Sequence, residues 1–118
     1  MANAGSEHAP AFAGPAPAIV YHFAAPADWT AAQASGEYAP EALAREGFLH
    51  CATQAQLPGV IERHQRGRGA LVRLSLDTAA LGAALRYDWS ARSGDHYPHV
   101  YGPIPLHAVR ATEPFEAP

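Results

Sequence analysis

Lysine is absent from this chain of 118 residues, so all eight of its permanently charged cationic side chains are arginines. The planar guanidinium group donates several hydrogen bonds in a fixed geometry that suits phosphate. Cysteine is nearly absent as well, because Cys51 is the only one. A single cysteine excludes a disulfide within the chain and favours a reducing compartment, so we predict a cytoplasmic location.

The sequence also lacks an apolar run long enough to span a membrane, a secretory signal pattern and a glycine-rich phosphate loop. The formal net charge of −3 provides no general attraction to nucleic acid or to an anionic membrane. We therefore expect no membrane partner, and RNA is not the expected ligand. Arg63, His64, Arg66 and Arg68 form a local basic patch. Such a patch is usually a solvated surface, and the alternative interpretation is a docking site for phosphate or RNA.

The chain is long enough for one domain with one core, which we assign to residues 18–118. Residues 1–17 are rich in alanine, glycine and proline, and we predict a disordered leader there. The remaining pattern favours an α+β fold with a small, bent or split, mainly antiparallel sheet and two or three helices. Strands are predicted at 19–23, 48–51, 70–77, 85–89, 98–101 and 106–115, and helices at 29–35, 40–46 and 53–66. Pro58 offers an alternative for the last helix, which then runs over 57–65 after an entry turn at 53–56.

The segment from Gly47 to Thr53 is a short apolar strand that leads directly into a predicted helix start, where Thr53 serves as the cap. Free N–H groups collect at such a start and favour a ligand nearby. His50 lies within this strand, and His22 and His99 lie within two other predicted strands. One such histidine is usually a core residue bonded to a carbonyl group, but three in one small domain favour a shared site.

Two kinds of site can be set aside on the residues alone. His22, His50, Cys51, His96 and His99 could ligate zinc, but their spacing is not that of a zinc ribbon or finger, so we expect no metal. Cys51 beside a histidine could act as a nucleophile, but a cysteine on an apolar strand is usually a packed and inert thiol.

A polar cleft that binds a nucleotide-type small molecule suits the remaining side chains better. Histidine and tyrosine hydrogen-bond ribose hydroxyls, aromatic rings stack on planar bases, and arginine pairs with phosphate. The sequence is compatible with a monomer or a small homo-oligomer. The predicted lining consists of His22, His50, Arg73, Tyr97, His99 and Tyr101.

Four blocks of the sequence resemble, in the same order, the small bacterial domain of unknown function 952. That family is similar to a compact ADP-ribosyltransferase fold, in which a split, bent sheet carries an NAD-binding cleft. The first two blocks also resemble the histidine-bearing strands of bacterial RNA 2′-phosphotransferases, whose basic N-terminal lobe is not seen in this sequence. The blocks are Tyr21-His22, Gly47 to Cys51, Leu71 to Leu74 and Tyr97 to Pro103, within a match from Ile19 to Phe115.

The resemblance implies NAD as cofactor and an ADP-ribosyltransferase-like reaction, in which the site stabilises a ribosyl cation. By resemblance, His22 binds a ribose hydroxyl and Asp88 stabilises the cation. His50 and His99 line the cleft as hydrogen-bonding groups or as proton carriers. The residues expected to contact NAD are Tyr21, Arg73, Tyr97, His99 and Tyr101.

Two departures from the family pattern leave the reaction open. Ala52 stands where the family usually has serine, and Asp88 stands where it usually has glutamate. A non-catalytic nucleotide-binding module of the same fold explains the same residues. A structural or partner-binding domain is a third alternative, and it predicts that the three histidines matter for stability alone.

Overall fold

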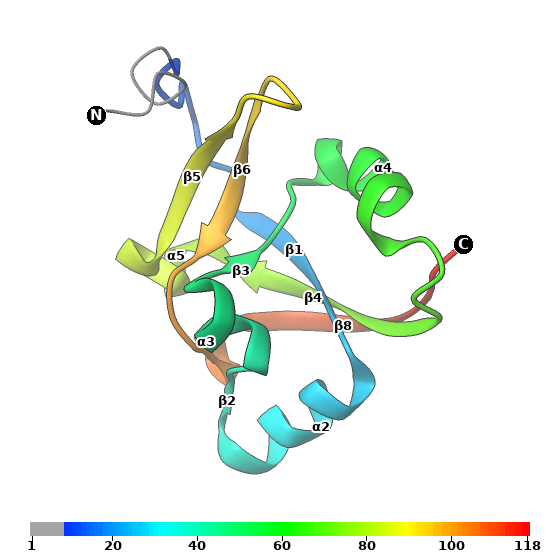
Figure 1. The fold of residues 1–118 in the computed structure, drawn as a ribbon. Coiled ribbons are helices and arrows are strands. Elements are labelled where there is room, and N and C mark those ends of the chain that lie inside the picture. The colour runs from blue at the N-terminus through cyan, green and yellow to red at the C-terminus, as the bar shows by residue number, and fades with distance from the viewer. Residues whose placement is uncertain (1–8) are drawn as a thin grey trace.

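The computed structural model describes residues 9–118, and the part of the predicted leader formed by residues 1–8 lies outside them. The described chain is an α+β domain of small antiparallel sheets with short helices, as the sequence predicted (Figure 1). Helix α2 and the β5–β6 hairpin lie toward opposite ends of the molecule in that view. Within residues 9–118, no helix has both the length and the apolar character required to cross a bilayer.

The sheets form because β-branched, aromatic and leucine residues alternate with polar ones along most strands. The first sheet has the order β1-β4-β8 and the second has the order β3-β6-β5, while β2 and β7 pair separately. An isolated bridge between Tyr21 and Ala52 joins the first two sheets, so the predicted split sheet is present. The strands are β1 (Ile19–Ala24), β2 (Glu37–Tyr38), β3 (Leu49–His50), β4 (Ala70–Asp77), β5 (Leu85–Ser90), β6 (Asp95–Val100), β7 (Ile104–Pro105) and β8 (Val109–Glu116).

The helices begin and end where the local sequence requires it. Helix α2 ends at Gly36 and α3 ends at Gly47, whose φ angles of 99° and 88° are in the left-handed region that glycine adopts most easily. Thr53 and Gln56 form a capping box, which confirms the predicted cap. The helical segments are α2 (Pro26–Ser35), α3 (Glu41–Glu46), α4 (Leu57–Val60), α5 (Thr78–Leu81), the 3₁₀ turns η1 (Gln54–Gln56), η3 (Gly82–Ala84) and η4 (Leu106–Ala108), and the π turn η2 (Ile61–Gln65).

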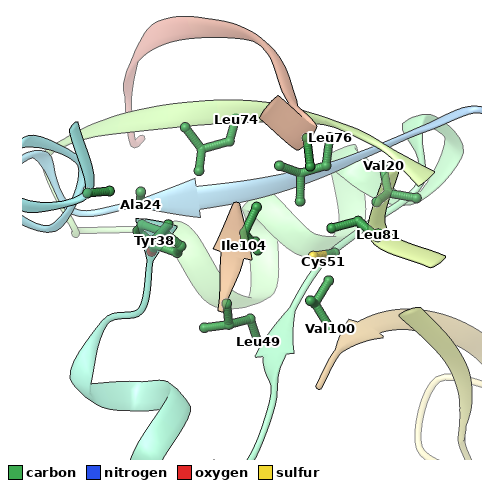
Figure 2. Close-up of a cluster of buried hydrophobic side chains, with 12 residues drawn as sticks. Val20, Ala24, Tyr38, Leu49, Cys51, Leu74, Leu76, Leu81, Val100 and Ile104 are labelled. Atoms are coloured by element: carbon green, nitrogen blue, oxygen red, sulfur yellow. The ribbon is translucent and has the colours of Figure 1, made fainter. Parts of the chain in front are cut away.

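The main core lies between the first and second sheets. Figure 2 shows Leu74 and Leu76 of β4 facing Ile104 and Leu49, and none of these four side chains has more than 2% of its surface exposed. Burying each leucine or isoleucine contributes on the order of 2 kcal/mol. This packing fixes which face of the second sheet points inward.

A second, smaller core covers the other face of β1 and β4. Phe23, Ala52, Leu57 and Leu71 are buried there, and Phe115 packs on Phe23 at a ring distance of 4.8 Å. Both faces of β4 are therefore partly apolar, because this second cluster covers the face that carries Leu71.

Residues 9–17 contain no helix or strand, yet they contact the domain. Phe12 stacks on Tyr87 with the ring centroids 4.1 Å apart and the planes 4° from parallel, and His96 Nε2 lies 2.8 Å from the carbonyl oxygen of Pro10. The hydroxyl of Thr78 donates to the carbonyl of Pro17 at 2.8 Å. The sequence did not indicate these contacts, because the aromatic residues concerned lie far apart along the chain.

Candidate functional site

The second sheet places polar side chains on its outward face. Leu49, Val100 and Leu85 pair across the three strands and pack into the core. The adjacent row pairs His50 with His99, and His99 with Arg86. Because successive side chains on a strand point to opposite faces, the row of His50, His99 and Arg86 faces outward.

Asp88 is the centre of this outward cluster. Its Oδ2 atom accepts a hydrogen bond from Nδ1 of His99 at 2.7 Å and a second, short one from the hydroxyl of Tyr101. Arg86 lies over the Tyr101 ring, with its guanidinium carbon 4.7 Å from the ring centre. Asp88, His99, Tyr101 and Arg86 thus form one connected polar group.

These contacts perturb the protonation of the group. Burial opposes the charged form of Asp88, but the hydrogen bonds from Tyr101 and His99 outweigh burial and hold the pKa of this carboxyl below its ordinary value. The hydrogen bond to Asp88, followed by burial, raises the pKa of Tyr101. Burial lowers the pKa of His99, although Asp88 opposes that change. Near neutral pH, His99 is therefore uncharged, with its Nδ1 proton donated to Asp88 and its Nε2 lone pair available.

His50 faces His99 from the neighbouring strand, with 5.1 Å between the two ring centroids. Its Nε2 atom lies 2.9 Å from Oε1 of Glu46, at the end of α3. The Phe48 ring stacks on His99 at 4.3 Å and contacts the edge of His50 at 4.8 Å. Two imidazoles, each with a carboxylate partner, therefore lie side by side against one phenyl ring. We call these residues, Glu46, Phe48, His50, Arg86, Asp88, His99 and Tyr101, the outward cluster.

His22 is close to this cluster but does not present its ring to it. Its Nδ1 lies 2.7 Å from the carbonyl oxygen of His50 and its Nε2 lies 2.8 Å from the hydroxyl of Tyr38. The residue keeps some exposed surface, but both nitrogens bond to protein groups. Burial lowers the pKa of His22 from 6.5 to about 4. The hydrogen bond to the His50 carbonyl opposes this change, and the charges of Arg68 and His50 add to it. His22 is thus a neutral link between β1, β2 and β3.

The structure does not bring Tyr21 and Arg73 to the outward cluster. Tyr21 alternates with His22 on β1 and therefore points to the opposite face, where it packs on the second core. The guanidinium carbon of Arg73 lies 5.2 Å from the centre of the Tyr21 ring, and Arg73 pairs with Glu113 of β8. The expectation that all the predicted lining residues converge is therefore wrong for Arg73 and for the ring of His22. Contact of Tyr21 and Arg73 with NAD stays a prediction.

Tyr97 lies on the outward face, two residues before His99 and directly opposite Asp88 in the strand register. Its hydroxyl accepts a hydrogen bond from Nη2 of Arg63 at 2.9 Å. Arg63 belongs to η2, so the helical segment after α4 contributes a cation to one end of this sheet face. Sequence reasoning placed Arg63 in a basic patch but did not connect it with Tyr97.

Cys51 lies on the inward side of the same chain segment and is 5% exposed. Burial raises the pKa of its thiol to about 12, so the thiolate is not formed near neutral pH. Within residues 9–118, no group of three or more histidine, cysteine or acidic side chains is arranged to hold a metal ion. A hollow of about 370 Å³ lies along α2 and β2, lined by residues such as Asp28, Ser35 and Glu37 and not by the outward cluster.

The sequence matches the family model described as "Protein of unknown function (DUF952)" over residues 23–112, which is more than half of the chain. The chain belongs to the DUF952 family. That membership confirms the resemblance to this family, with three of the four sequence blocks inside the matched residues and the Tyr21-His22 block just before them.

Among solved structures, this DUF952 chain is similar to protein CC0527 from Caulobacter crescentus. The crystal structure of that protein has 28% sequence identity to this chain and a TM-score of 0.74, and the match covers 81% of this chain and 84% of the other. Its solution NMR structure has 28% identity, a TM-score of 0.69 and coverage of 82% and 84%. No curated protein matches the sequence. These similarities assign no activity to the chain, and the outward cluster is the part of the structure that bears on its function.

Proposed function

We propose that this DUF952 protein binds a nucleotide-type ligand on the outward face of the β3-β6-β5 sheet, with NAD as the ligand indicated by the resemblance. The observation that supports this most directly is the pair of facing imidazoles, His50 and His99, whose orientation is fixed by Glu46 and Asp88. Among the described residues, Nε2 of His99 has no hydrogen-bond partner, so it can accept one from a ribose hydroxyl.

The residues of the cluster fit such a ligand. Phe48 and Tyr101 supply aromatic surface beside the two imidazoles, and Arg86 supplies a guanidinium for phosphate. When bound, NAD would supply a nicotinamide–ribose bond that can be broken to transfer ADP-ribose. The protein's part would be to bind the ribose through His99, to orient it against Phe48, and to take up a proton at Nε2 of His99.

Asp88 suits a positioning role better than the role of cation stabiliser that the resemblance implies. Its Oδ2 atom already accepts bonds from His99 and Tyr101. A carboxylate engaged in this way fixes the tautomer and orientation of His99, as carboxylates do beside many histidines. The same observation favours a second candidate function, a nucleotide-binding module without turnover, because it leaves less negative charge free at the cluster.

Isothermal calorimetry of NAD against the wild-type protein and His50→Ala tests the proposal. His50 is exposed, so its truncation should leave the fold intact, while the loss of one hydrogen bond to the ligand should weaken binding about tenfold. His107→Ala is the matched control, because His107 is also exposed but lies on η4. Equal affinities for all three proteins, or no binding by the wild type, would refute the proposal.

The two candidate functions differ in one product. A transferase or hydrolase of NAD releases nicotinamide, which chromatography detects, whereas a binding module raises the melting temperature with NAD and releases none. Binding without release would favour the module. Release that persists in His99→Gln would show that Nε2 of His99 is not the group that takes up the proton.

A further inference from the structure

Within residues 9–118, the arginines divide into those that form salt bridges and those that do not. Salt bridges occupy Arg45, Arg66, Arg73 and Arg110. In the same residues, Arg63, Arg68, Arg86 and Arg92 have no carboxylate within salt-bridge distance.

Arg63 and Arg86, two of these four residues, contact the outward sheet face at different points. The Arg63 guanidinium donates to the hydroxyl of Tyr97, and the Arg86 guanidinium lies over the Tyr101 ring. His99 lies between Tyr97 and Tyr101 in sequence and on the same face. Tyr97 and Tyr101 are four residues apart, which is about 13 Å of extended chain, so the two arginines contact tyrosines that flank His99 along the chain.

Each guanidinium contacts a tyrosine and forms no salt bridge within residues 9–118, although the charge of Arg86 also helps to lower the pKa of Asp88. Arg63 also packs over the backbone of Gly59, where a Cβ atom would approach its Nη1 to 2.8 Å, so glycine provides room for this side chain. A guanidinium that is fixed in place but unpaired loses little conformational entropy when it binds phosphate in a bidentate manner. This is the arrangement expected of a phosphate-binding group before its ligand arrives.

We infer that Arg63 with Tyr97, and Arg86 with Tyr101, form two anion-binding subsites on the outward sheet face, so that the ligand carries more than one negative group. The inference rests on the proposed function and narrows its substrate class to a ligand with two phosphate groups, such as the diphosphate of a dinucleotide. A ligand with one phosphate reaches only one of the subsites.

Calorimetry with Arg63→Gln, Arg86→Gln and Arg92→Gln tests this inference. Glutamine removes the charge but keeps a donor for Tyr97, and Arg92 lies in the exposed turn between β5 and β6, so Arg92→Gln controls for the change in net charge. We expect each of the first two variants to bind NAD about tenfold more weakly, the double variant about a hundredfold, and Arg92→Gln as the wild type. AMP has only one phosphate, so one of the two single variants should weaken AMP binding and the other should leave it unchanged. Thermal melting checks that each variant is folded.

Failure of this inference and failure of the proposed function give different results. If the wild type binds NAD and Arg63→Gln binds it equally well, the Arg63 subsite is wrong while the proposed function stands. If the wild type does not bind NAD, titration with inorganic pyrophosphate, followed by amide and guanidinium NMR shifts, decides the matter. Shifts at Arg63 and Arg86 but not at Arg92 would support the two subsites, and their absence would overturn both ideas.

Discussion

His22 should make the stability of this protein fall as the pH decreases below neutral. Its two ring nitrogens lie against the carbonyl oxygen of His50 and the hydroxyl of Tyr38, and burial lowers its pKa from the ordinary value of 6.5 to about 4. Between these two values the unfolded chain binds a proton at this position that the folded chain does not. The free energy of unfolding therefore decreases with falling pH in this window and levels off below it.

The size of the effect follows from the same two values. The difference between 6.5 and about 4, at about 1.4 kcal/mol for each tenfold change in proton affinity, corresponds to about 3 kcal/mol. About 2 kcal/mol of this should already be lost between neutrality and about pH 5. That is a large share of the stability expected of a domain of this size.

Guanidinium unfolding curves at about pH 7 and about pH 5 measure this loss. His22→Gln removes the titrating group, while its amide can still donate to the His50 carbonyl and accept from Tyr38, so this variant should lose about 2 kcal/mol less than the wild type over the interval. His107→Gln, exposed on η4, is the matched control. Burial also lowers the pKa of His99, so His22→Gln should retain a part of the dependence. Equal losses in the wild type and His22→Gln would refute the reasoning.

Three further predictions concern separate parts of the structure. Asp88→Asn should lower the pKa of His99 further, because the hydrogen bond and charge of Asp88 raise it, and an NMR titration showing an unchanged or higher value would contradict the assignment. Phe12→Ala should destabilise the fold by about 1 kcal/mol through loss of the stack on Tyr87, and urea unfolding should show a lower midpoint. An unchanged midpoint would show that the contact of residues 9–17 with the domain contributes nothing to stability. Cys51 should resist a thiol reagent in the folded protein and react only on unfolding, because burial raises the pKa of its thiol to about 12. Fast labelling of the folded protein would show that Cys51 is not buried.

Much of the local structure could be predicted from the sequence because it depends on neighbouring residues. The strand from Ala70 to Asp77 was predicted with the bounds that the structure has, since β-branched and leucine residues alternate there with polar ones. Gly36 and Gly47 end α2 and α3 as expected, because glycine adopts the left-handed conformation at low cost. The cap at Thr53 is equally local.

The members of the outward cluster were only partly predictable. His50, His99, Asp88 and Tyr101 were predicted and do lie together. Arg86 was missed, although it lies two residues before Asp88 on a predicted strand and alternation alone places the two side chains on one face.

Phe48 and Glu46 were missed for different reasons. Phe48 reads as a core residue, and it meets His99 only because β3 pairs with β6. Glu46 reaches His50 because α3 ends directly before β3, a geometry that the turn at Gly47 determines. No sequence pattern in either segment points to these contacts.

The sequence by itself determined most of the extended and helical segments and the membership in the DUF952 family. Only the tertiary structure decided which of the candidate residues share a surface. Packing of Leu49, Val100 and Leu85 into the core turns His50, His99 and Arg86 outward, whereas the bridge between β1 and Ala52 turns His22 toward Tyr38 and Tyr21 toward the second core. The physical reason is that alternation along a strand assigns residues to two faces, but burial between sheets determines which face is wet.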